Sequence, residues 1–79
     1  MRIEGNTLID DDIIGIPLEI DLNSLYGIEV DHDFRYPKVK ITYYGGAAYR
    51  HFDFYDEMKE WVKEFKRLVN GYYKTQGRT

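Results

Sequence analysis

The stretch KITYYGGAAYRHF, residues 40–52, predicts a β-hairpin and anchors the fold class of the whole chain. Its paired glycines, residues 45–46, form a two-residue loop of the kind found in type I′ and II′ turns, which require positive φ angles. This loop places Ile41 opposite Arg50. A four-residue loop over residues 45–48 keeps the same faces, whereas a three-residue loop turns the second arm over. We therefore expect an even loop.

The even loop divides the hairpin side chains between two faces. One face is apolar and carries Val39, Ile41, Tyr43 and Phe52. Arg50 falls on this apolar face, so its guanidinium must lie beyond the core or reach out to solvent. The opposite face combines rings with cations, namely Lys38, Lys40, Thr42, Tyr44, Tyr49 and His51. We expect this second face to lie uncovered on the sheet.

Alternating apolar and polar residues before the hairpin predict further strands. The run IIGIPLEIDL, residues 13–22, has the period of 2 that is typical of a strand with one buried face. Pro17 in this run donates no amide hydrogen, which favours a sheet edge or a bulge. Another strand is predicted over RIEGNTLI, residues 2–9, and is followed by a solvated acidic turn at residues 10–12. A further strand places three apolar side chains inward, Tyr26, Ile28 and Val30.

From Asp56 the period changes to 3.6, which predicts an amphipathic helix. Its apolar stripe holds Met58, Trp61, Val62, Phe65, Leu68, Val69 and Tyr72. Asn70 and Gly71 are expected to end the helix, since glycine readily adopts the left-handed conformation found just past a helix end. The stripe must cover the inward face of the sheet. Residues 74–79 are expected to form a flexible tail.

These patterns predict an α+β fold, in which an antiparallel meander of four to five strands carries one C-terminal amphipathic helix packed on one face. At 79 residues the chain is expected to form a single domain over residues 1–73. The sequence contains no cysteine, no signal-peptide pattern and no long apolar run. We therefore expect a soluble, cytoplasmic protein without disulfides.

The net charge of -3 is unevenly distributed along the chain. Residues 1–33 carry nine acidic residues and one basic residue, a balance of -8. Residues 34–79 carry ten basic and five acidic residues, a balance of +5. Two interpretations are open. Either the two halves interleave in one sheet and neutralise each other, or the surface is bipolar, with one acidic and one basic side.

Residues suited to catalysis or metal binding are few. His32, Asp33 and Asp53 supply imidazole and carboxylate ligands, but their spacing matches no recognised metal motif. Residues 10–12 lack the spacing of a calcium-binding loop. Ser24 is the single serine, and neither histidine lies in a context that would activate it. We therefore expect no enzymatic activity, no cofactor and no metal.

The uncovered hairpin face suggests nucleic acid as one class of partner. Single-stranded nucleic-acid binders present stacking rings with interleaved cations, and the candidates here are Lys38, Lys40, Tyr44, Tyr49 and His51. The order of elements over residues 13–70, strands and then one helix, resembles that of a family of small single-stranded DNA-binding proteins, which implies binding through the open sheet. The acidic N-terminal half argues against this class, because such binders usually present a basic footprint.

A protein partner is the favoured alternative, because exposed tyrosines are enriched at protein interfaces. The expected surface joins the hairpin face to an acidic edge: Tyr44, Tyr49, Lys40, Lys38, His51, Asp10, Asp11, Asp12, Glu19 and Asp21. In its size, acidity and lack of cysteine, the chain resembles phage or mobile-element inhibitors of host nucleic-acid enzymes, anti-CRISPR proteins among them. That resemblance implies a non-catalytic inhibitor in the host cytoplasm. Membrane binding is not expected, and a homodimer formed through an exposed strand edge is a third alternative.

Overall fold

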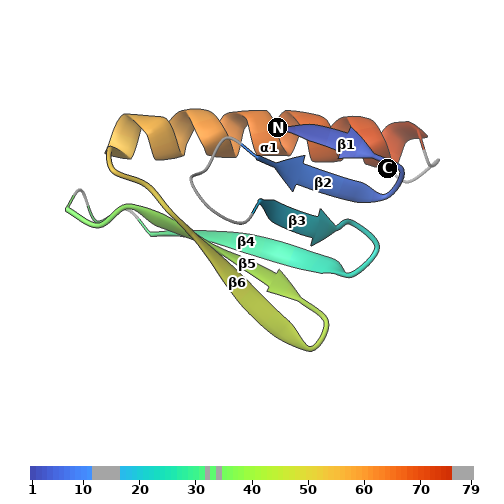
Figure 1. Ribbon diagram of the computed structural model, residues 1–79, viewed down its shortest axis with the longest axis horizontal. Helices are drawn as coiled ribbons and strands as arrows, with labels where there is room; N and C mark the ends of the chain where they lie inside the picture. The colour runs from blue at the N-terminus through green and yellow to red at the C-terminus, as the bar shows by residue number, and fades with distance from the viewer. Residues whose placement is uncertain (12–16, 32, 34, 76–79) are drawn as a thin grey trace. The chain divides into compact units, whose positions relative to one another are not determined.

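The computed structural model describes residues 1–11, 17–31, 33 and 35–75 (Figure 1). In order along the chain, the elements are the strands β1 (Arg2–Glu4), β2 (Thr7–Asp10), β3 (Leu18–Asp21), β4 (Leu25–Asp31), β5 (Lys38–Tyr43) and β6 (Gly46–His51), and the helix α1 (Tyr55–Thr75). The predicted α+β class with a C-terminal helix is confirmed. The chain divides into two compact units, an N-terminal unit of Met1–Asn23 with Lys63–Thr79 and a central unit of Ser24–Val62.

The strands form two sheets rather than one. Three antiparallel strands in the order β1-β2-β3 lie in the N-terminal unit, and three more in the order β4-β5-β6 lie in the central unit. The meander order within each sheet is as predicted, but the single sheet of four to five strands is wrong. Alternation along a strand predicts which of its faces is buried, but it does not encode which strands exchange hydrogen bonds.

The segment at residues 2–9 is a hairpin, not the single strand that its sequence predicted. Glu4 pairs with Thr7, so Gly5 and Asn6 form a two-residue loop. Gly5 has a φ of +62° and Asn6 has no positive φ, which is the pattern of a type II′ turn. Turns of this type match the twist of the flanking strands, and they allow the chain to reverse after only three strand residues.

β3 confirms the predicted alternation in its described part. Ile20 and Leu22 are buried, whereas Glu19 is exposed. β3 is an edge strand of its sheet and begins just after Pro17, in keeping with the missing amide hydrogen of the proline. The first part of the predicted strand, residues 13–16, lies outside the described residues.

The core of the N-terminal unit combines strand and helix side chains. Its buried apolar members are Leu8, Ile20, Leu22, Phe65, Val69 and Tyr72. Each large apolar side chain that leaves water contributes roughly 1.5 to 3 kcal/mol, so this small set provides most of the unit's stability. Within the described residues, no helix is long and apolar enough to cross a membrane.

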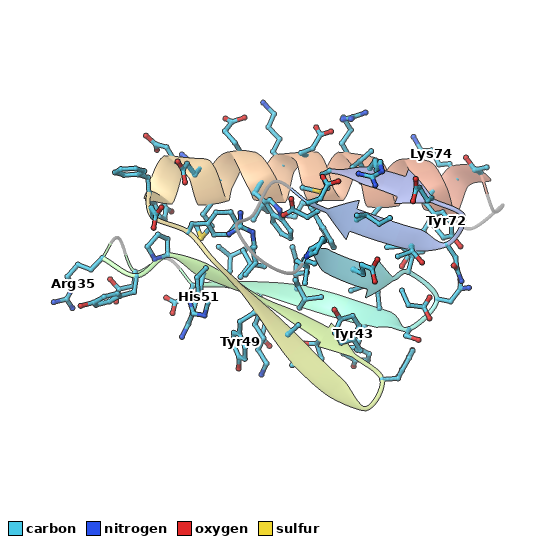
Figure 2. The ribbon with its side chains drawn as sticks, viewed as in Figure 1. Arg35, Tyr43, Tyr49, His51, Tyr72 and Lys74 are labelled. Carbon is cyan, nitrogen blue, oxygen red and sulfur yellow. The ribbon has the colours of Figure 1, made fainter. Side chains whose placement is uncertain are left out.

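α1 continues for a further turn past its predicted end at Gly71. The Tyr72 side chain is buried, and its hydroxyl donates a hydrogen bond to Asn23 Oδ1 at 3.3 Å (Figure 2). The Tyr73 hydroxyl donates to the Leu22 carbonyl at 3.4 Å. A glycine costs a helix about 1 kcal/mol, which is less than the burial of a tyrosine ring contributes. The helix therefore runs through Gly71, and it includes the first two residues of the expected tail.

The β5–β6 hairpin has the predicted faces but a different loop. Tyr43 pairs with Gly46, so the two loop residues are Tyr44 and Gly45 instead of the two glycines. Gly45 has a φ of +99° and Tyr44 has no positive φ, which is the pattern of a type II turn rather than type I′ or II′. The loop has moved by one residue but is still even, so Ile41 remains on the buried face as predicted.

A bulge in β4 overturns the predicted orientation of Tyr26. Leu25 pairs with Tyr43 and Gly27 pairs with Thr42, which leaves Tyr26 as the extra residue between them. The Tyr26 side chain is 72% exposed, although its position in the alternating pattern predicted that it would face inward. Leu25 takes the inward position in its place, opposite Tyr43.

The core of the central unit includes three fully buried side chains, Val39, Ile41 and Met58. The rings of Phe52 and Trp61 meet edge to face, with their centroids 5.8 Å apart. The guanidinium of Arg50, the predicted misfit of the apolar face, lies 4.4 Å from the centre of the Phe52 ring and donates a hydrogen bond to the His51 carbonyl. Its aliphatic stem thus stays with the apolar face while the charged end reaches the strand edge, as expected for a long cationic side chain.

Candidate functional site

The outer face of the sheet β4-β5-β6 is built from two rows of opposed residues. Side chains alternate between the faces of a strand, so the neighbours of the buried Val39 and Ile41 point away from the core. The first row consists of Glu29, Lys40 and Tyr49, and the second consists of Asp31, Lys38 and His51. Each row reads carboxylate, lysine and aromatic ring across the three strands. We call these six residues the charged-aromatic face.

Contacts along and between the rows hold these side chains close together. The Lys38 ammonium lies 3.9 Å from the Asp31 carboxylate and 5.7 Å from the centre of the Tyr49 ring. The rings of Tyr49 and His51, both on β6, are stacked at a centroid distance of 6.4 Å and an interplanar angle of 30° (Figure 2). A lysine within about 6 Å of a ring is attracted to its face. The face therefore presents rings and charges as one connected group.

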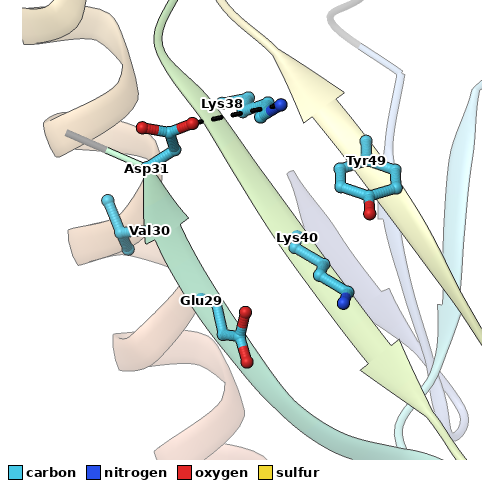
Figure 3. Close-up of a pocket in the computed structure, with 6 residues that line it drawn as sticks. All are labelled: Glu29, Val30, Asp31, Lys38, Lys40 and Tyr49. Atoms are coloured by element: carbon cyan, nitrogen blue, oxygen red, sulfur yellow. Dashed lines mark ion pairs between the residues drawn. The ribbon is translucent and has the colours of Figure 1, made fainter. Parts of the chain in front are cut away.

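The charged-aromatic face is hollowed into an open depression. Its volume is about 410 Å³, and it is lined by Glu29, Val30, Asp31, Lys38, Lys40 and Tyr49 (Figure 3). A depression of this size on a sheet surface can seat one or two side chains, and the nearby rings supply apolar contact. The lining places both carboxylates on β4, both ammonium groups on β5 and the ring on β6.

The charges of this face cancel locally. Two carboxylates, Glu29 and Asp31, stand opposite two lysines, Lys40 and Lys38. An exposed ion pair of this kind contributes little to stability, but the carboxylates reduce the positive potential that the lysines would otherwise project. The face can therefore form charged hydrogen bonds of both signs without attracting one sign of partner over long range.

Tyr44, expected on the same face as Tyr49, lies instead in the hairpin loop. It is 73% exposed, and its ring meets that of Tyr26 edge to face at a centroid distance of 5.7 Å. Tyr49 is paired with Lys40 of β5. Lys40 and Tyr44 are four residues apart in the chain, so Tyr49 and Tyr44 are separated by about 13 Å along the direction of β5. The structure does not bring them together, and Tyr26, which the sequence predicted to be inward, joins Tyr44 at the loop.

The predicted acidic edge is only partly exposed. Asp10 is the last residue of β2 and is 1% exposed, so the solvated turn expected at this position is wrong. Leu8 and Asp10 lie on the same side of β2, and the inward side carries the core, which explains the burial. Glu19 and Asp21 are exposed on β3 as expected. Asp12 lies outside the described residues.

Asp11 is exposed and is engaged by Arg2. The Arg2 guanidinium donates a hydrogen bond of 2.6 Å to the Asp11 carboxylate, and this bond lowers the pKa of Asp11 below its ordinary value. Arg2 also contacts the Glu4 carboxylate at 3.4 Å. The one cation on the strands β1, β2 and β3 is therefore held by carboxylates of its own unit.

Glu29 and Asp31 are members of the face that the sequence prediction left out. Both alternate with Ile28 and Val30, and this pattern already indicated that they point away from the core. Their position beside the lysines depends on the pairing of β4 with β5, which the sequence pattern did not specify. The sequence pattern thus predicted that Glu29 and Asp31 point away from the core, but it did not predict that they lie beside the lysines of β5.

Among the described histidine, aspartate and glutamate side chains, no group of three or more is placed to hold a metal ion. The Asp33 carboxylate accepts a hydrogen bond of 2.9 Å from the Arg35 backbone amide and lies 3.7 Å from the Arg35 guanidinium. This side chain is thus part of a turn. His32, the histidine considered as a ligand together with Asp33 and Asp53, lies outside the described residues.

Comparisons of the chain with protein-family models, with curated proteins and with solved structures find no match.

Proposed function

We propose that this chain is a non-catalytic interaction protein that binds a protein partner through the charged-aromatic face. The observation that carries the proposal is the register of the sheet, which sets each lysine of β5 between a carboxylate and an aromatic ring. Protein interfaces favour aromatic rings, which bury area at a low entropic cost, and paired charges of both signs beside a ring fix the orientation of the partner.

The balance of charge on this face favours a protein over a nucleic acid. Glu29 and Asp31 face Lys40 and Lys38 one to one. A nucleic-acid site relies on an excess of cations to displace counterions from phosphates, whereas a protein surface can offer complementary groups of both signs. The proposed partner therefore carries its own mixed charges around an apolar side chain that enters the depression beside Tyr49.

The class of partner follows from the bulk resemblance of the sequence. A small, acidic chain without cysteine is typical of phage and mobile-element inhibitors, so the proposed partner is a host protein that handles nucleic acids. Such an inhibitor acts by covering the surface with which the host protein binds its nucleic acid, and this needs no catalytic group. This part of the proposal rests on composition, and the site itself rests on the register.

Paired charge substitutions test the proposal. The partner is captured from a nuclease-treated lysate and identified, and its affinity for each variant is then measured. We expect Tyr49→Ala to weaken binding by about 30-fold or more, as for a ring at the centre of an interface. Lys40→Gln and Glu29→Gln should each weaken it, because both signs are used. Thr42→Ala, on the same side of β5 in the next row, is the matched control and should bind like the native chain.

A second candidate function, binding of single-stranded nucleic acid, is supported by the stacked rings of Tyr49 and His51 beside Lys38. It predicts the opposite sign for one substitution. Removal of the Glu29 carboxylate would strengthen binding of a thymidine oligonucleotide, because a repulsive charge is lost, whereas Lys40→Gln would weaken it. Oligonucleotide binding at low salt with this pair of responses would overturn the protein-partner proposal.

A further inference from the structure

Within the part of the chain that the structure describes, the strand β6 is an edge strand that lacks the usual protection. Its sheet has the order β4-β5-β6, so β5 is its neighbour on one side. β6 is six residues long and Arg50 is its single formal charge. By contrast, β1 has three residues of which two are charged, β3 carries two carboxylates, and β4 is interrupted by its bulge. Short length, charge and bulges are the features that discourage strand addition.

The hydrogen-bond pattern shows which backbone groups of β6 face outward. The Phe52 amide donates to the Pro37 carbonyl at 3.0 Å, so this residue of the second arm points towards β5. Alternate residues of an antiparallel strand point the same way, hence Gly46, Ala48 and Arg50 also face β5. The amides and carbonyls of Ala47, Tyr49 and His51 consequently face the open edge. The Arg50 guanidinium donates to the His51 carbonyl at one end of this edge.

The side chains of β6 are self-complementary about Tyr49. Two small residues, Ala47 and Ala48, precede it, and two large ones, Arg50 and His51, follow it. When two copies of the strand pair antiparallel with Tyr49 opposite Tyr49, each alanine stands opposite one of the large side chains. The same register opposes Ala47 and His51 of the two copies, so every outward-facing pair can exchange backbone hydrogen bonds.

We propose that a second copy of this chain adds to β6, with the two strands antiparallel and centred on Tyr49. The register satisfies the open edge, sets each Arg50 and each His51 opposite an alanine, and offsets the two Arg50 residues by about 7 Å along the strands. A register shifted by two residues would leave some outward-facing groups unpaired. The interface is isologous, as in most dimers, because the same strand of each copy forms it. The outward-facing backbone groups at its centre are then all paired.

The dimer would join two charged-aromatic faces across the shared edge, with the two Tyr49 rings side by side. This inference does not rest on the proposed function, because the edge groups belong to the backbone and need no other partner. A two-fold arrangement would nevertheless raise the avidity for any partner that presents its site twice. An interface made by one strand pair is small, so we expect a dissociation constant of about 1 to 100 μM.

The full-length chain alone is sufficient for the first test. Sedimentation equilibrium from about 1 μM to 1 mM should show a monomer and dimer in exchange. Ala47→Pro removes an outward amide without disturbing the pairing with β5, and should weaken dimerisation roughly 10- to 100-fold. Ala47→Ser keeps the amide and should change the constant by less than about threefold. A monomer at all concentrations, or equal constants for the two variants, overturns the proposal.

Cysteine substitutions test the register, because the native chain has no cysteine. Directly opposed residues of a hydrogen-bonded pair have Cα atoms about 5.5 Å apart, within the range that a disulfide spans. Tyr49→Cys should therefore form a disulfide-linked dimer under mild oxidation, whereas Ala47→Cys and His51→Cys should each form no disulfide with a copy of itself. An equimolar mixture of the last two variants should form a mixed dimer. Equal crosslinking at all three positions, or a mixed dimer of the Ala47→Cys and Tyr49→Cys chains, overturns the register.

Discussion

The two sheets share a plan but differ on their outer faces. Each has three antiparallel strands in chain order and a tight hairpin with a left-handed glycine. The outer side of β1-β2-β3 carries Arg2 and three carboxylates, Glu4, Glu19 and Asp21. The outer side of β4-β5-β6 instead carries two carboxylates, two lysines and two aromatic rings. The same architecture thus supports an acidic surface in one unit and a balanced, ring-bearing surface in the other.

The central sheet also shows where the acidic and basic parts of the sequence meet. The acidic first part of the chain, residues 1–33, ends just after β4, and the basic second part begins before β5. Because β4 and β5 are paired, residues of the two parts face each other in the central sheet and neutralise each other there. The net charge of a sequence segment therefore does not predict the net charge of a surface of the folded chain. Pairing between strands decides it.

The largest effect is expected from truncating the two cores. Leu8 in the N-terminal unit and Ile41 in the central unit are both fully buried. Leu8→Ala and Ile41→Ala should each lower the free energy of unfolding by about 2 to 5 kcal/mol, through lost burial and a residual cavity. For a chain of this size that is a large part of the total, which is about 4 to 12 kcal/mol. Urea titrations followed by far-UV circular dichroism measure the change.

Trp61 makes this pair of variants a test of whether the units unfold together. It is the single tryptophan, and it lies in the central unit against Phe52. Since α1 runs without interruption from one unit into the other, we expect Leu8→Ala to shift the tryptophan fluorescence transition as much as the circular dichroism transition. A fluorescence transition that stays in place would mean that the units unfold separately. Thr42→Ala, on the outer side of β5, is the control.

An intermediate effect is expected at the hairpin glycines. Gly45 has a φ of +99°, a conformation that side chains rarely adopt, so Gly45→Ala should cost about 1 to 2 kcal/mol. The adjacent Gly46 has no positive φ, and an added Cβ would meet nothing within 4 Å. Gly46→Ala should therefore be neutral or stabilising by up to about 1 kcal/mol. Gly5→Ala, at a φ of +62°, should resemble Gly45→Ala.

The expected stabilities of Gly45→Ala and Gly46→Ala differ although the sequence pattern placed both glycines in the hairpin loop. Thermal unfolding of the two single variants measures it, with the native chain as reference. A Gly46→Ala variant that is the more damaging of the two would contradict a positive φ at Gly45 alone, and equal costs would indicate the type I′ loop over both glycines that the sequence predicted. Equal costs in both variants would contradict the type II pattern of the turn.

The sequence predicted those features that depend on one element at a time. The helix, the buried side of β3 and the even hairpin loop follow from periodicity, which acts over a few residues. The bulge at Tyr26, the loop at Tyr44 and the length of α1 depend on partners elsewhere in the chain. Tyr72 shows this most clearly, since contacts with Asn23 and the core carry the helix past a glycine that would otherwise end it.

The candidate site was predictable to the same degree. The sequence predicted the correct face for four residues of the hairpin, because alternation along each arm and an even loop are enough to fix it. These residues are Lys38, Lys40, Tyr49 and His51. Glu29 and Asp31 were missed as members, because their neighbours depend on strand pairing. Asp10 was expected in solvent, since three successive aspartates suggest a turn, but β2 extends far enough to draw the first of them into the buried row. Local composition cannot locate the last residue of a strand.

The smallest effect is expected at the Arg2–Asp11 pair of the N-terminal unit. Its hydrogen bond lowers the pKa of Asp11 from the ordinary value of 3.8, so the pair stabilises the fold above that value. This contribution is lost as the pH falls through the lowered pKa of the folded state, because a protonated carboxyl no longer attracts the guanidinium. Titration of the side-chain carboxyl by NMR should give a midpoint below 3.8 in the native chain. In Arg2→Met the midpoint should return towards the ordinary value.

Glu64 provides an internal reference for this measurement. A hydrogen bond from Arg67, on the same helix, lowers the pKa of Glu64 in the same way, and Arg2 has no part in that bond. The titration of Glu64 should therefore be identical in the native and Arg2→Met chains, while that of Asp11 moves. An unchanged Asp11 midpoint would mean that Arg2 is not held by the Asp11 carboxylate. Arg2 would then be a cation available to an acidic partner, and the contrast between the two outer faces would be smaller than the pairing indicates.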